Sequence, residues 1–342
     1  ALPIYELGHA LGIEHPFDNL IFDNISSEYN SSLYSVMAYE SFYNPGDRNP
    51  YTDGTNLAVN NRSNNKFLFS ENWAMLDISV LGLKYGFNSS YNSEDNTYTF
   101  EGNNEITNIH DMGGYDTIDL SNWSNDNNNG SERIDLSGGA VFQVSRFKMD
   151  WGDEVTTGQV ITTSLETEIE RFIGSSGDEK IYLGPTSDFI SSNSGDDIIY
   201  NVGLFKNLSL IQIDAGVGDD DVYVYTYNDE VNSLLSINGG DGNDWLNVFN
   251  ADEEIDLSIY IEHFDNFEGY WFWSSEAQTI IVDEEDFIEV SGPGYLTILA
   301  GSEDTIILPD GAIEDTSIIN DFYDYYVLND ITIEIVDDLQ IG

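Results

Sequence analysis

Hydrophobic and polar residues follow two different patterns in this chain, and the change lies near residue 88. Before it, apolar residues recur at helical spacing in residues 4–11, which end at Gly12, and in residues 72–85, which end at Gly86. After it, runs of two or three β-branched or aromatic residues follow turns rich in Gly and Asp. The pattern therefore predicts two helices joined by a polar loop, and then β-structure.

Nine-residue repeats occur within the β-structure. The aligned units are residues 174–182, 183–191, 192–200, 215–223 and 239–247. The last unit reads GGDGNDWLN and fits the calcium-repeat pattern G-G-x-G-x-D-x-U-x, in which U is a large apolar residue, at every fixed position. Each unit predicts a six-residue turn and a three-residue strand, which make one half-turn of a flattened right-handed coil.

The chemistry of the repeats favours calcium. In every unit the sixth position is acidic and the eighth is apolar. Glycine allows backbone angles that a Cβ would forbid, the acid supplies carboxylate oxygen, and the apolar residue points inward. Ordinary Asp-Gly turns are the alternative, but five units in register favour ions between stacked turns. The candidate calcium residues in the repeats are Gly174, Gly177, Glu179, Asp188, Gly195, Asp197, Gly218, Asp220, Gly240, Gly242 and Asp244.

A second candidate metal site lies in the first forty residues. Residues 5–15 read YELGHALGIEH, and SVMAY follows at residues 35–39. The pattern is H-E-x-x-H-x-x-G-x-x-H with a methionine turn, except that Tyr5 stands where the first His belongs. The helix would present position 5 and His9 on one face, and the turn after it would bring His15 to the same metal. Glu6 would then take a proton from water activated by zinc.

Composition narrows the range of partners. The chain has 342 residues, with 10 Lys+Arg against 63 Asp+Glu, for a formal net charge of -53. Such an excess is relieved by divalent cations bound between carboxylates, and it excludes nucleic acid as a partner. Cysteine is absent, so no disulfide can replace a metal as a staple. No stretch is long and apolar enough to span a bilayer.

Taken together, the motifs resemble those of the serralysins, secreted bacterial metzincin peptidases that carry calcium-binding RTX β-rolls. The matching text is ELGHALGIEHP, SVMAY, AMLDISVLGLKYG and DMGGYDTIDLS, followed by the repeats, over about residues 4–250. The resemblance implies an extracellular protein, exported by type I secretion machinery, that cleaves extracellular proteins or peptides. It also implies that the upstream half of the catalytic domain lies outside this chain.

The resemblance assigns roles to single residues. Zinc ligands are expected at His9, His15 and Tyr39, with Tyr5 as a further candidate, and the catalytic residues are expected to be Glu6 and Tyr39. Calcium ligands outside the repeats are expected at Asp111, Gly113, Gly114, Asp116, Glu168 and Glu170. Residues 92–96 depart from the family's Arg-x-Gly-x-Thr.

The expected fold is mainly β. A remnant of the α-helical lower subdomain of a metzincin is expected at residues 1–88, a parallel β-roll of RTX repeats at 89–250, and a C-terminal β-domain at 251–342 that ends in a type I secretion signal. Three hypotheses for function stay open. The chain could belong to a working zinc endopeptidase with zinc and calcium as cofactors, to an inactive calcium-binding module for extracellular binding or adhesion, or to a peptidase in which Tyr5 is a working ligand.

Overall fold

Two units make up the chain, one formed by residues 1–119 and 132–169 and the other by residues 120–131 and 170–342. The computed structural model describes residues 2–15, 34–38, 73–100, 106–123, 132–143, 160–202, 210–225, 235–249, 254–257, 264–273, 277–282, 295–299, 304–314, 323–328, 331–336 and 340–341. Tyr39 and the segment expected to join the two helices lie outside these residues.

The first unit contains both helices, α1 (Leu2–Ala10) and α2 (Met75–Tyr85). Gly12 ends α1 with a φ of 73°, and the amide N–H groups of Gly12 and Ile13 bond back to the carbonyls of His9 and Gly8, both at 2.9 Å. This is the Schellman arrangement, which reverses the chain after the helix. Neither α1 nor α2 is long and apolar enough to cross a membrane, and no other helix in the described residues is.

A buried carboxylate joins the start of α2 to the methionine turn. Asp77 is 1% exposed and accepts hydrogen bonds from the Ser35 hydroxyl at 2.6 Å, from the Val36 amide at 2.8 Å and from the Ala74 amide at 3.0 Å. Burial raises the pKa of Asp77, and the three donors oppose that shift. The turn is therefore held by a charge that lies on another element.

The strands of the first unit are short. They are β1 (Thr97–Thr99), β2 (Ile106–Ile109), β3 (Thr117–Asp119), β4 (Glu132–Asp135), β5 (Val141–Gln143) and β6 (Val160–Thr163). β1 pairs in parallel with β3, and β6 pairs in parallel with β2 and antiparallel with β5.

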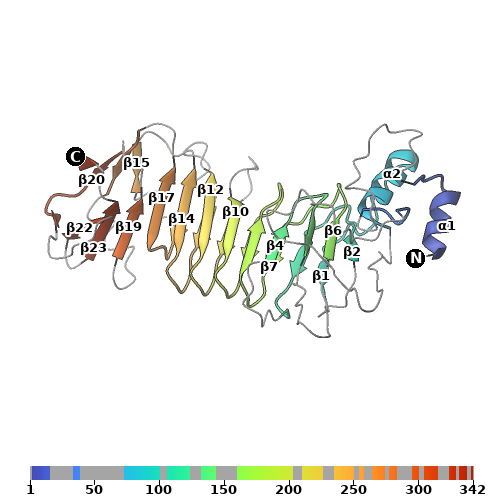
Figure 1. Cartoon of the computed structure of the whole chain (residues 1–342), viewed down its shortest axis with the longest axis horizontal. Helices are drawn as coiled ribbons and strands as arrows, with labels where there is room; N and C mark the ends of the chain where they lie inside the picture. Colours follow the sequence, from blue (N-terminus) through green and yellow to red (C-terminus); the bar gives the residue numbers. More distant parts are fainter. Residues whose placement is uncertain are drawn as a thin grey trace, which may run out of the picture. The chain divides into compact units, whose positions relative to one another are not determined.

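In the second unit the repeats form a coil whose successive strands alternate between two parallel sheets. One sheet contains β7 (Arg171–Ile173), β9 (Phe189–Ser191), β11 (Ile211–Asp214), β13 (Leu235–Asn238) and β16 (Phe264–Asp265). The other contains β8 (Glu179–Tyr182), β10 (Ile198–Val202), β12 (Asp221–Tyr225), β14 (Trp245–Phe249) and β17 (Gly269–Trp273), of which β10 to β17 stand side by side in Figure 1. The eighth-position residues Ile181, Ile190, Ile199, Val222 and Leu246 are fully buried, so the core lies between the sheets.

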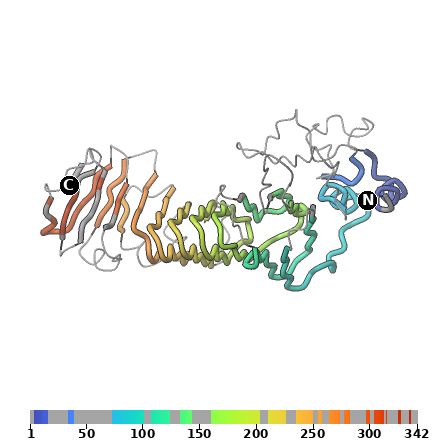
Figure 2. The backbone as a smooth tube through the Cα atoms, turned by 60° about the horizontal axis from the view of Figure 1, so that its bottom comes forward, coloured from blue at the N-terminus to red at the C-terminus, as the bar shows by residue number. Residues whose placement is uncertain are grey.

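Parallel stacking continues past residue 250, as the successive turns of the backbone tube in Figure 2 show. β17 pairs in parallel with β14, and β19 (Tyr295–Leu299) pairs in parallel with β17 and β23 (Ile331–Val336). Antiparallel pairs join β23 to β22 (Tyr323–Leu328) and β22 to β21 (Ile313–Glu314). A further parallel sheet is built from β15 (Glu254–Asp256), β18 (Thr279–Ile281), β20 (Thr305–Ile307) and β24 (Gln340–Ile341). The expectation of a mainly β chain with a parallel β-roll is confirmed.

Candidate metal sites

Acidic residues form a column along one edge of the roll. Glu179, Asp197, Asp220 and Asp244 each stand at or just before a strand of the same sheet, and each is at most 2% exposed. The amide of each residue donates to the carboxylate of the next: Glu179 to Asp197 at 2.7 Å, Asp197 to Asp220 at 2.7 Å, and Asp220 to Asp244 at 2.8 Å. Stacking of the turns therefore places the carboxylates one above another and uses one oxygen of each Asp.

The second oxygens of the three Asp residues in this column lack hydrogen bonds. The Oδ2 atoms of Asp197, Asp220 and Asp244 are buried and have no hydrogen-bond partner. Burial raises the pKa of Asp197 to about 9, of Asp220 to about 7 and of Asp244 to about 6, and neighbouring carboxylates add to each shift. Buried anionic oxygens without a partner are costly. A bound cation would remove that cost.

Carbonyl oxygens of neighbouring turns lie close to carboxylates of the column. A Cβ on Gly174 would lie 2.9 Å from Oε2 of Glu179 and would collide with the carbonyl oxygen of Ser192 in the next turn. A Cβ on Gly242 would collide with the carbonyl oxygen of Gly218. Calcium takes six to eight oxygen ligands, from carboxylates and carbonyls alike. The donor set therefore fits calcium.

Most of the predicted repeat residues lie in this stack of turns. They are Gly174, Gly177, Glu179, Gly195, Asp197, Gly218, Asp220, Gly240, Gly242 and Asp244. Asp188 does not join them, because it precedes β9 in the other sheet, where its amide donates to the carbonyl of Glu170 at 2.9 Å. Glu168 is exposed and Glu170 is half-buried.

One member of the column was missed by the sequence analysis. Oε2 of Glu268 accepts a hydrogen bond from the amide of Asp244 at 2.8 Å, so Glu268 is the fifth carboxylate of the stack. Burial raises its pKa. The available signal was an acid directly before a strand, since Glu268 precedes Gly269 as Asp244 precedes Trp245.

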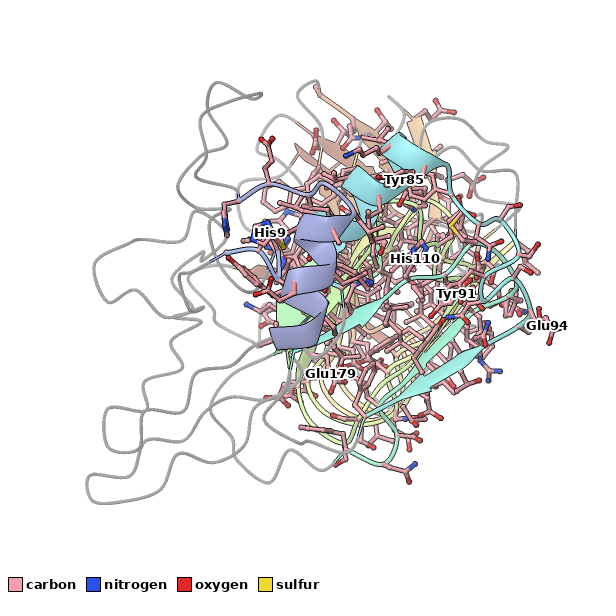
Figure 3. The ribbon with its side chains drawn as sticks, turned by 90° about the vertical axis from the view of Figure 1, so that its right-hand side faces the viewer. His9, Tyr85, Tyr91, Glu94, His110 and Glu179 are labelled. Atoms are coloured by element: carbon pink, nitrogen blue, oxygen red, sulfur yellow. The ribbon has the colours of Figure 1, made fainter. Side chains whose placement is uncertain are left out.

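Three of the predicted zinc residues, Tyr5, His9 and His15, converge at the end of α1, where Figure 3 labels His9. The ring centroids of His9 and His15 lie 4.8 Å apart, and the Tyr5 ring lies 4.8 Å from His9 and 5.6 Å from His15. Met37 is fully buried, and a Cβ on Gly8 would collide with its sulfur, so the methionine turn packs directly beneath the helix. Glu6 is exposed on α1.

The tautomer of His15 follows from its contacts. The carbonyl oxygen of Met37 lies 2.7 Å from Nδ1, and because a carbonyl can only accept, Nδ1 carries the proton. In the neutral ring Nε2 then has the lone pair, and it accepts a hydrogen bond from the Tyr5 hydroxyl at 3.1 Å. Fixing one ring nitrogen so that the other can bind is how proteins orient a histidine ligand.

Two imidazoles and a phenol therefore fit zinc, which takes nitrogen and oxygen ligands. No group of three or more His, Cys, Asp or Glu side chains that could hold one metal ion occurs among the described residues, neither here nor in the acidic column, where backbone carbonyls would have to complete each site. The third member of this set is Tyr5, and Tyr39 lies outside the described residues.

Comparison with known proteins supports the resemblance. No protein-family model matches the chain. A serralysin of Photorhabdus luminescens is 26% identical over 196 residues, which cover 51% of this chain and 34% of that protein. Serralysin C of Dickeya chrysanthemi is 27% identical over 196 residues, with the same two shares covered, and a serralysin of Proteus mirabilis is 28% identical over 185 residues, 52% of this chain and 34% of that protein. This chain is related to the serralysins. It spans about a third of the length of these serralysins.

The loop expected to match the first serralysin calcium loop is held by protein donors. Asp111 is fully buried; its Oδ1 accepts from the Gly113 amide at 3.0 Å, and its Oδ2 accepts from the Asn96 side chain at 3.3 Å and from the Tyr98 hydroxyl. Asp116 accepts from the Asn96 amide at 2.9 Å, and a Cβ on Gly114 would collide with the backbone of residue 94. Both oxygens of Asp111 are thus engaged, and an ion in this loop stays a prediction.

A stacked pair lies next to this loop in the sequence. The rings of Tyr91 and His110 have centroids 5.4 Å apart at 21°, and Figure 3 labels both. Burial lowers the pKa of His110, against the opposing effects of Glu166 and Asp111. No motif signals this pair, because His110 lies outside all of them.

Proposed function

We propose that this chain is part of a secreted zinc-dependent endopeptidase whose β-roll is stabilised by calcium. The relationship to serralysins, which are zinc metalloproteases, supports the peptidase at family level. The observation that carries the proposal for this chain is the hydrogen bond of His15 to the carbonyl of Met37, which turns a basic nitrogen toward Tyr5 and His9.

The role proposed for each residue follows from its position on α1, in the turn after it or in the methionine turn. His9, His15 and Tyr5 would hold the zinc, together with Tyr39. A bound zinc would supply Lewis-acid activation of water. Glu6, exposed beside Tyr5, would accept the proton that this water loses. The substrates would be extracellular proteins or peptides, and export would use type I secretion machinery.

Calcium is proposed for the acidic column. The buried Oδ2 atoms of Asp197, Asp220 and Asp244 and the carbonyl oxygens around the glycines support it. Extracellular calcium modules bind with dissociation constants of about 10⁻⁴ to 10⁻³ M. Folding of the roll would therefore be coupled to arrival in a medium rich in calcium.

A second function is favoured by one contact. The Tyr5 hydroxyl already donates to Nε2 of His15 at 3.1 Å, and a phenol, whose ordinary pKa is about 10, ligates zinc readily only once it has lost its proton. If the proton stays, the protein is a calcium-stabilised module for extracellular binding or adhesion that has lost catalysis.

Proteolysis by a chimera distinguishes the two functions. The upstream part of a serralysin catalytic domain is placed before this chain, with Tyr5 or with Tyr5→His. Activity of the Tyr5 form that Glu6→Ala abolishes and the nearby control Glu14→Ala retains supports the peptidase. Activity that appears only with Tyr5→His supports the loss of catalysis at this single position. A folded Tyr5→His chimera without activity supports the binding module.

A further inference from the structure

The last turn of α2 reaches the chain reversal that follows α1. Lys84 and Tyr85 are the last two residues of α2, and Figure 3 labels Tyr85. Nζ of Lys84 donates to the carbonyl oxygen of Leu11 at 3.2 Å and to that of Gly12 at 3.1 Å. The hydroxyl of Tyr85 donates to the same Leu11 oxygen at 2.8 Å. Three hydrogen bonds from one helix therefore hold the end of the other.

The charge of Lys84 suits this contact between two helix ends. The last carbonyls of a helix lack partners within it, so each C-terminus carries a partial negative charge. Two C-termini that meet repel each other unless a cation lies at the contact. Lys84 supplies an ammonium from the last turn of α2, and this ammonium binds carbonyls just past the end of α1. A neutral side chain at this position would leave the repulsion in place.

The same ammonium packs against the residue at which the chain reverses. Gly12 has a φ of 73°, and a Cβ at this position would collide with Nζ of Lys84. His15 follows three residues later, where its Nδ1 donates to the carbonyl oxygen of Met37 at 2.7 Å. The segment from Gly12 to His15 is thus held at its start by α2 and at its end by the methionine turn.

We propose that Lys84 is a positioning residue for the metal site at the end of α1. By binding the carbonyls of Leu11 and Gly12, it keeps the reversal closed, so that the ring of His15 stays 4.8 Å from that of His9. The inference rests on the proposed zinc site for its function. The placement of His15 that Lys84 maintains does not depend on a bound metal.

The test compares Lys84→Met with Lys84→Arg. Methionine keeps a long unbranched side chain without charge or N–H donors, whereas arginine keeps both. Arg133→Met removes an equal charge from a partly exposed side chain of the same unit and serves as the control. Competition with a chromophoric chelator measures zinc affinity. We expect Lys84→Met to bind zinc about tenfold more weakly, at the low end of the effect of losing a partner that orients a histidine ligand, and the other two variants to bind it as the wild type does.

The tautomer of His15 in the metal-free chain is the second readout. Nitrogen chemical shifts of the ring report it, at a pH where the ring is neutral. We expect the proton on Nδ1 in the wild type, in Lys84→Arg and in Arg133→Met, and a mixture of tautomers in Lys84→Met, because the loosened segment no longer holds Nδ1 against the Met37 carbonyl. A merely structural role for Lys84 would lower the free energy of unfolding and leave this tautomer unchanged.

The outcomes separate Lys84 from the zinc site. Either readout unchanged from the wild type in Lys84→Met overturns the proposal, and so does a loss that Lys84→Arg fails to restore. A wild-type chain that binds no zinc contradicts the proposed zinc site, and the tautomer alone then decides the role of Lys84. If Lys84→Met does not fold, as judged by circular dichroism, Lys84→Gln replaces it, with the same expected results and the same result that overturns the proposal.

Discussion

The contact between Tyr5 and His15 decides whether the site at the end of α1 can bind zinc. The Met37 carbonyl fixes the tautomer of His15, and the hydroxyl of Tyr5 occupies the nitrogen that a metal would need. A metal must therefore either take the phenol as a ligand after its proton leaves, or displace it. A substitution at Tyr5 therefore changes zinc affinity while leaving His9, His15 and Met37 in place.

At this scale we predict that Tyr5→His strengthens zinc binding by at least about tenfold, because a third imidazole binds without giving up a proton at neutral pH. Competition with a chromophoric chelator measures the affinity. Tyr115→His adds an imidazole at an exposed position of the same unit and serves as the control. Equal affinities in Tyr5→His, Tyr115→His and the wild type would contradict the convergence of residues 5, 9 and 15.

Asp77 gives a second prediction for a single residue. Asparagine cannot accept hydrogen bonds on its nitrogen, so Asp77→Asn sets an amide N–H₂ against at least one of the donors from Ser35, Val36 and Ala74. We expect the free energy of unfolding of the first unit, which contains both helices, to fall by about 2 to 4 kcal/mol. Denaturant unfolding followed by tryptophan fluorescence measures it, with Glu14→Gln, an exposed change in the same unit, as the control. Equal midpoints would show that Asp77 does not hold the methionine turn.

When no metal is bound, the stability of the turns of the roll depends on the protonation of their buried carboxylates. Burial raises the folded-state pKa of Asp244, Asp220 and Asp197 from 3.8 to about 6, 7 and 9, with Glu179, Asp196, Asp219, Asp221 and Glu268 adding negative charge around them. Because the folded state holds these protons more tightly than the unfolded chain, the contribution of these three groups to stability is greatest below about pH 4 and is lost as the pH rises through the folded pKa values.

We therefore expect the metal-free roll to melt, as followed by circular dichroism, above room temperature at pH 5 and below it at pH 8, where excess chelator leaves the roll unfolded. Saturating calcium should remove most of this difference, since the cation stabilises the charged carboxylates. A melting temperature of the metal-free protein that rises with pH would show that burial does not raise the pKa values of these acids.

The repeat period of the roll decides how much of its structure could be predicted from the sequence. The glycine and acid periods predicted the coil, the inward residues Ile181 and Val222, and the acids that form the column. These periods could not predict that Glu268 joins the column. Its turn, residues 266–268, has only three residues and none of the repeat glycines, so it does not match the nine-residue pattern. Nor could they predict that Tyr98 bonds to Asp111, since that donor comes from a strand outside any motif. The parallel stacking past residue 250 could not be predicted, because the sequence there has no regular repeat.

At the scale of the whole molecule, a net charge of -53 opposes compaction by self-repulsion, which bound cations relieve. We predict that a chelator unfolds residues 170–250 cooperatively, because their buried carboxylates then face one another without a counter-charge. Far-UV circular dichroism in excess EGTA measures this loss. An unchanged spectrum would contradict a structural role for calcium in the roll.

The most direct test of the account is the content of both metals in the same sample. The chain is folded in millimolar calcium with trace zinc, loosely bound ions are removed, and the metals per chain are measured by mass spectrometry. We predict several calcium ions in the acidic column and about one zinc at Tyr5, His9 and His15. Calcium without zinc would leave the binding module in place of the peptidase. A folded chain without bound calcium would contradict the central claim.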